Sequence, residues 1–141
     1  ERVHAVIGVN PSKTYAVSPY VRQELLRAML KELNVSNVEV VIVYSFVWKH
    51  VQAHGAKAMY RGLRSWQQDG AAEKLLEAQN VMGQLLLGRR WPIPTVYIQA
   101  DPRFAQVSST LLRQRLKSNE PITDLVPAGC AALVRAAYAE K

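Results

Sequence analysis

The chain has 141 residues, of which 49% are hydrophobic and 21% charged, a composition that excludes disordered, collagen-like and low-complexity proteins. This length fits one domain, and we expect residues 1–141 to form it. The 18 lysines and arginines outnumber the 11 acidic residues, so the net charge of +7 favours anionic partners such as nucleic acid, a membrane surface or a phosphate-rich small molecule. The single cysteine excludes an internal disulfide and a cysteine-cluster zinc site, and no apolar run reaches the ~18 residues of a membrane-spanning helix.

Short β-rich runs alternate with helical patterns along the chain. The strand patterns cover residues 3–9, 38–43, 58–60 and 94–98, and the helical patterns cover residues 18–33, 46–54, 71–87, 108–117 and 127–139. Ser18-Pro19 is typical of an N-cap followed by proline at the first helical position, and Gly55 is typical of the glycine after a helix. Because such alternation with long crossovers requires parallel strands, the sequence predicts an α/β fold, a doubly wound parallel sheet with helices on both faces.

In such a fold ligands bind at the carboxyl ends of the strands, so the loops there are the candidate sites. The loop after the first strand carries Lys13, a single cation that can equally be a solvated loop lysine. The third strand is followed by Arg61-Gly62-Leu63-Arg64, where two arginines can contact polyphosphate oxygens and Gly62 lets a ligand approach the backbone. The alternative is that this arginine pair forms salt bridges with acidic residues further along the chain.

Two further loops follow the second and fourth strands. Ser108, Ser109 and Thr110 put three hydroxyls at a helix N-terminus, which is either an anion site or an ordinary serine N-cap. Val47 and Trp48 are apolar, so they either pack in the core or border an apolar ligand arm. Three cationic or phosphate-type loops at one sheet edge together indicate a nucleotide polyphosphate site, although neither a P-loop nor a dinucleotide-binding fingerprint is present.

The segments Asn10-Pro11-Ser12-Lys13, Arg61-Gly62-Leu63-Arg64 and Val107-Ser108-Ser109-Thr110, in this order, resemble bacterial-type phosphopantetheine adenylyltransferase of the nucleotidylyltransferase superfamily. The resemblance covers nearly the whole chain and includes Arg22 in the first long helix. It also includes an acid, a glutamate and an asparagine downstream of Arg64, at Asp69, Glu73 and Asn80. The implied fold is the Rossmann-like nucleotidylyltransferase fold.

The resemblance implies a role for each matching residue. Lys13 and Arg64 are expected to be catalytic through charge neutralisation of the phosphates. The residues expected to bind ATP are Gly62, Arg64, Glu73, Ser108, Ser109 and Thr110. Those expected to bind 4′-phosphopantetheine are Lys13, Val47, Trp48, Arg61 and Asn80.

The implied reaction transfers the adenylyl group of ATP to 4′-phosphopantetheine, which gives dephospho-coenzyme A and pyrophosphate. Mg²⁺ is expected to accompany ATP, and no protein residue is expected to ligate a metal. Coenzyme A is a further expected ligand, whereas nucleic acid and membranes are not expected partners. The resemblance also implies a homo-oligomer, commonly a hexamer in this family, and a cytoplasmic location, with an upstream targeting leader left open.

One family segment has no counterpart in residues 1–141. The family begins with a strand followed by Gly-x-Phe-Asp-Pro-x-x-x-Gly-His, whereas His4 falls in a strand pattern and His50 and His54 fall on a helix and at its end. The family's first strand lies in the middle of the sheet, and the resemblance implies that this strand is missing from residues 1–141. We therefore expect about 25–35 further residues before Glu1, including a Gly-His segment.

Other functions are compatible with the same residues. One is a non-catalytic homologue that binds nucleotide or coenzyme A, and another is an adenylyl- or cytidylyltransferase with a different acceptor, because the Ser-Ser-Thr segment does not identify the acceptor. A small basic nucleic-acid binder would need its cations in one stripe, but they are scattered along the helices.

Overall fold

The structure, a computed structural model, describes residues 1–63, 66–88 and 91–139. The chain divides into two compact units. Unit 1 consists of Glu1–Tyr44 and Val107–Lys141, and unit 2 consists of Ser45–Gln106.

Unit 1 contains a parallel pair of strands joined by a helix. β1 (Val3–Gly8) and β2 (Val38–Val43) pair in register from Val3 opposite Val38 to Gly8 opposite Val43. Helix α1 (Pro19–Glu32) provides the crossover between them and packs on β2. The strands therefore have the strand–helix–strand connection that the alternating sequence pattern predicts.

The core of unit 1 lies between α1 and the C-terminal helices. α1 begins where the Oγ of Ser18 accepts the amide hydrogen of Val21 at 3.2 Å, with proline at the first helical position. Leu25 of α1 packs with Ile122 and with Val134 of α5 (Ala131–Ala139), and all three are buried. The 3₁₀ turn η3 (Ala128–Cys130) leads into α5, and helix α4 (Ser109–Lys117) precedes both.

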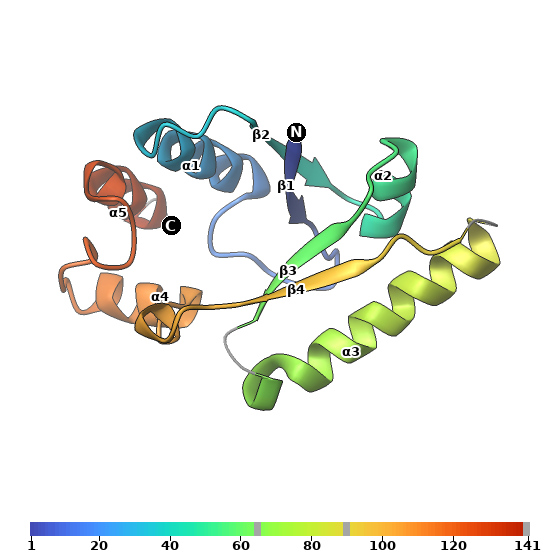
Figure 1. Cartoon of the computed structure of the whole chain (residues 1–141). Helices are drawn as coiled ribbons and strands as arrows, with labels where there is room; N and C mark the ends of the chain where they lie inside the picture. The colour runs from blue at the N-terminus through green and yellow to red at the C-terminus, as the bar shows by residue number, and fades with distance from the viewer. Residues whose placement is uncertain (64–65, 89–90, 140–141) are drawn as a thin grey trace. The chain divides into compact units, whose positions relative to one another are not determined.

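Unit 2 contains a second parallel pair of strands with a long helix beside it (Figure 1). β3 (Met59–Leu63) and β4 (Thr95–Gln99) pair from Met59 opposite Thr95 to Leu63 opposite Gln99. Helix α3 (Trp66–Met82) continues directly into a π-helical segment, η1 (Gly83–Leu87). The short helix α2 (Val47–Ala53) precedes β3, and the short 3₁₀ turn η2 (Pro102–Phe104) follows β4.

The predicted α/β class with parallel strands and helical crossovers is confirmed. Gly55, with φ of +59°, follows α2 as the sequence predicts, because this left-handed conformation favours glycine. The described strands form two pairs. The missing first strand and the single-domain organisation stay predictions. The third strand was predicted to end at residue 60, but β3 continues to Leu63, so Arg61 and Gly62 are strand residues. Among the described helices, none is both long and apolar enough to cross a membrane.

Candidate functional site

In unit 1, the turn that follows β1 presents Lys13. Its shape comes from Asn10, whose side-chain oxygen accepts the amide hydrogen of Ser12 at 2.9 Å and whose carbonyl accepts that of Lys13 at 3.1 Å. The hydroxyl of Tyr15 accepts the amide hydrogen of Asn10 at 2.8 Å. Such side chain–backbone bonds fix the turn, while the Lys13 side chain itself is exposed. The local geometry therefore suits a cation that meets an anionic ligand from solvent.

Arg22 on α1 is a second cation connected with this turn. Its guanidinium lies over the ring of Tyr15, 5.2 Å from the ring centroid. One guanidinium nitrogen, Nη1, is buried and has no hydrogen-bond partner among the described residues. Burying an unsatisfied donor on a charged group costs free energy, and an anion would satisfy it. Arg22 was part of the family resemblance but was not predicted as a site residue. The signal that could have indicated it is an arginine in the first turn of the helix that follows the Lys13 loop.

Also in unit 1, the start of α4 has the features of both an N-cap and an anion site. The Oγ of Ser108 accepts the amide hydrogen of Leu111 at 3.2 Å, which confirms the N-cap interpretation for this residue. Ser109 and Thr110 occupy the first two helical positions, where backbone amides have no acceptor within the helix. The cap occupies only one of the first backbone amides of α4, so the others have no acceptor within the helix.

In unit 2, charged side chains meet between β3 and α3. The burial of β3 alternates, with Met59 and Leu63 buried, so Arg61 lies on the same face as these two core residues. Arg61 forms a bidentate ion pair with Glu73 of α3, in which Nη2 donates to Oε1 at 2.9 Å and Nε donates to Oε2. Arg61 thus forms a salt bridge with an acidic residue further along the chain, which was the alternative to ligand binding. The ion pair also compensates a guanidinium charge that would otherwise be partly buried without a partner.

Tyr97 extends this polar cluster along β4. It lies opposite Arg61 in the strand pairing, and its hydroxyl donates to Oε2 of Glu77 at 3.1 Å. Burial and the hydrogen bond to Glu77 raise the pKa of Tyr97, so the phenol stays protonated and acts as a donor. Glu73 and Glu77 are four residues apart on α3, so both present their carboxylates to the strand pair.

Further along α3 and in η1, two polar side chains are buried. Asn80 is 9% exposed, and Gln84, at 0%, accepts the amide hydrogen of Ile93 at 2.9 Å through Oε1 while its Nε2 has no partner among the described residues. Trp48 is 4% exposed and lies against Gly83, where only a residue without a Cβ fits. The burial of Gln84 was not predicted, because a single glutamine within a helical run gives no signal of burial.

Comparison with curated proteins decides the family. The phosphopantetheine adenylyltransferase of Bifidobacterium longum (strain DJO10A) is 28% identical over 142 aligned residues, which cover 100% of this chain and 80% of the relative. That of Thermobifida fusca (strain YX) is 29% identical, with 99% of this chain and 79% of the relative covered. The protein of the same name from Rhizobium etli is 30% identical over 131 residues, which cover 91% of this chain and 76% of the relative. The chain belongs to the phosphopantetheine adenylyltransferase family. No family model matches it.

The structure brings some residues of the adenylyltransferase motif together. Arg61 and Glu73 are in direct contact, whereas Trp48 occupies the core position that was the alternative to a ligand-binding one. The remaining motif residues lie in elements described above: Lys13 and Ser108–Thr110 in unit 1, and Val47, Gly62 and Asn80 in unit 2. Arg64 lies outside the described residues. The ligand roles of all these residues stay predictions.

Proposed function

We propose that this protein transfers the adenylyl group of ATP to 4′-phosphopantetheine and releases pyrophosphate and dephospho-coenzyme A. The observation that carries the proposal is the 30% identity to a phosphopantetheine adenylyltransferase over 91% of the chain. The exposed Lys13, the start of α4 and the cluster around Arg61 support it, because each offers groups suited to phosphate or amide ligands.

In the proposed reaction, a phosphate oxygen of phosphopantetheine attacks the α-phosphorus of ATP in line with the leaving group. The bond from this phosphorus to the oxygen bridging it to the β-phosphate breaks, and pyrophosphate departs with that electron pair. No covalent protein intermediate is needed, so the protein contributes positioning and charge neutralisation. Lys13 would contact phosphates of both substrates, and Arg64 would neutralise the ATP polyphosphate.

The other motif residues would divide between the two substrates. Ser109 and Thr110 would bind the β- and γ-phosphates with their hydroxyls and amides, and Ser108 would combine this role with its cap. Gly62 and Glu73 would contribute to the ATP site. The arm of phosphopantetheine would be held by Arg61, Asn80 and Val47. Arg22, with its unsatisfied Nη1, would add a cation to the phosphate-binding part of unit 1.

Mg²⁺ would enter with ATP rather than through a dedicated protein site. Among the residues that the structure describes, no three carboxylates gather as a hard-cation cage would require. The ATP phosphates would hold the ion, which would supply further neutralisation of the developing charge. Coenzyme A as a product-type ligand, a homo-oligomer such as a hexamer, and a cytoplasmic location belong to the same proposal.

The direct test measures dephospho-coenzyme A and pyrophosphate from ATP, 4′-phosphopantetheine and Mg²⁺ with the purified protein. Lys13→Ala is expected to lower kcat about 10²–10³-fold, the effect of removing one group that stabilises the transition state. Lys117→Ala, which removes an exposed cation at the end of α4, serves as the matched control. ATP or coenzyme A binding without turnover would favour the non-catalytic homologue, and turnover only with another phosphate acceptor would overturn the phosphopantetheine assignment.

A further inference from the structure

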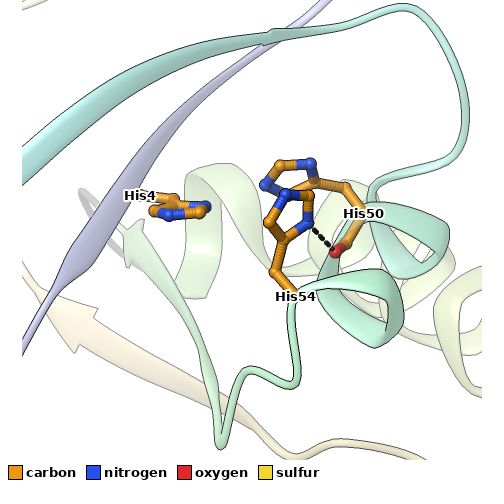
Figure 2. A group of neighbouring side chains, drawn as sticks. All are labelled: His4, His50 and His54. Atoms are coloured by element: carbon orange, nitrogen blue, oxygen red, sulfur yellow. Dashed lines mark hydrogen bonds between the residues drawn. The ribbon is translucent and has the colours of Figure 1, made fainter.

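Helix α2 carries two histidines, His50 and His54, that face one another. Residues four apart lie on the same side of a helix, one turn above the other. The centroids of the two imidazole rings are 4.0 Å apart and the ring planes are inclined by 32°, an arrangement visible in Figure 2, which also draws His4 of β1. His54 is the C-cap residue of α2, so the pair sits at the end of this helix.

A hydrogen bond within the pair indicates the tautomer of one ring. Nδ1 of His54 lies 2.8 Å from the carbonyl oxygen of His50 (Figure 2). A carbonyl only accepts, so Nδ1 carries the hydrogen, and in the neutral ring the lone pair is then on Nε2. Metal-binding histidines almost always donate their second ring N–H to a carbonyl or carboxylate in this way, because that bond orients the ring and sets its tautomer.

We propose that His50 and His54 bind a borderline transition-metal ion such as Zn²⁺ through one ring nitrogen each. Potential ligand nitrogens of the two rings lie within 4.8 Å of one another. Tetrahedral Zn²⁺ with ligands at about 2.0–2.1 Å places them about 3.3 Å apart, a distance that side-chain rotations can reach. Water or further ligands complete the coordination sphere.

This ion differs from the Mg²⁺ of the proposed reaction in both ligand type and place. Imidazole suits Zn²⁺, Cu²⁺ and Ni²⁺, whereas Mg²⁺ requires oxygen ligands and would be carried by ATP phosphates. The consequence for the fold is local. A metal that joins residues 50 and 54 would fix the last turn of the seven-residue α2, the helix that also carries the buried Trp48. The site is independent of whether the protein is an adenylyltransferase.

The test is a competition for Zn²⁺ between the purified protein and a chromophoric chelator, with excess Mg²⁺ present. The wild type is expected to take one equivalent, and His50→Gln and His54→Gln are each expected to weaken binding at least about tenfold, because a single imidazole forms no chelate. The double variant should bind Zn²⁺ no more weakly than either single variant. Lys49→Gln, an exposed change on the same helix, retains both rings and should bind as the wild type does.

Side-chain ¹H–¹⁵N spectra with and without Zn²⁺ provide a second, direct readout. The expected result is a large shift of the His54 Nε2 resonance, with Nδ1 still protonated. His54 is exposed, so His54→Gln carries the test even if His50→Gln lowers stability; circular dichroism without metal checks the fold of each variant. Equal Zn²⁺ affinity of the wild type and the double variant, or unchanged His54 resonances on addition of Zn²⁺, would overturn the proposal.

Discussion

The contact between Gly83 and Trp48 can be tested by adding one methyl group. A Cβ placed on Gly83 would lie 2.4 Å from Nε1 and 2.8 Å from Cε2 of the indole ring. Neither distance is compatible with van der Waals contact, so Gly83→Ala requires the ring or the helix to move. Because Trp48 is only 4% exposed, its ring has little space in which to shift.

Two opposing effects set the size of the change. Alanine in place of glycine favours a helix by about 1 kcal/mol, whereas overpacking a core costs about 1–3 kcal/mol. The rigid, buried indole ring favours the upper half of that second range. We therefore expect Gly83→Ala to lower the free energy of unfolding by about 1–2 kcal/mol. For a chain approaching 150 residues, each kcal/mol lowers Tm by about 2–4 °C.

Urea denaturation followed by far-ultraviolet circular dichroism, together with calorimetry, measures this loss. Gly62→Ala is the control, because a Cβ there meets no atom within 4 Å and stability should change by less than about 0.5 kcal/mol. In a background of Trp48→Leu, the cost of Gly83→Ala should largely disappear, since the two residues are coupled through direct contact. A Gly83→Ala protein as stable as the wild type would refute this account of the packing.

Three further predictions concern polar contacts. Glu73→Gln should lower the free energy of unfolding by about 1.5–3 kcal/mol, as seen by urea denaturation, because the partly buried guanidinium loses its charged partner. Ser108→Ala should cost about 1 kcal/mol through loss of the N-cap, whereas Ser109→Ala should leave stability unchanged and weaken ATP binding measured by calorimetry. The hydrogen bond from the Cys130 thiol, aided by a backbone amide, lowers the pKa of Glu32. The stability from Glu32 is therefore complete above its unfolded pKa of about 4.3 and is lost as pH falls through the lowered folded value, so Glu32→Gln should flatten that part of the stability–pH curve.

Elements whose ends carry a local chemical signal were predictable from the sequence. Ser18-Pro19 starts α1 and Gly55 follows α2, because the cap and the positive φ depend on residues close in the chain. The long apolar run at 38–43 likewise forms β2. The start of α3 was predicted at residue 71, but the helix begins at Trp66.

Features that depend on distant residues could not be read from local patterns. The π-helical segment and the indole ring against Gly83 bring together residues 35 positions apart, and no periodicity of one segment indicates the other. The burial of Gln84 has the same origin, since its side-chain oxygen accepts from the amide of Ile93 across a loop. At the site, the resemblance supplied the residue identities, but it did not supply which of them contact one another.

Arg61 shows how a local signal and its structural setting combine. An arginine followed by glycine favours a loop, yet here the strand continues because Glu73 compensates the charge on the core-facing side of β3.

The ion pair between Arg61 and Glu73 does not conflict with the proposed ligand role of Arg61. A guanidinium has five N–H donors, and the bidentate contact through Nε and Nη2 uses two of them. The other donors can still bind a ligand, while Glu73 holds the guanidinium plane in one orientation. In the proposed site, Glu73 would thus position Arg61, and Arg61→Lys, which keeps the charge but not the fork, would lose this arrangement.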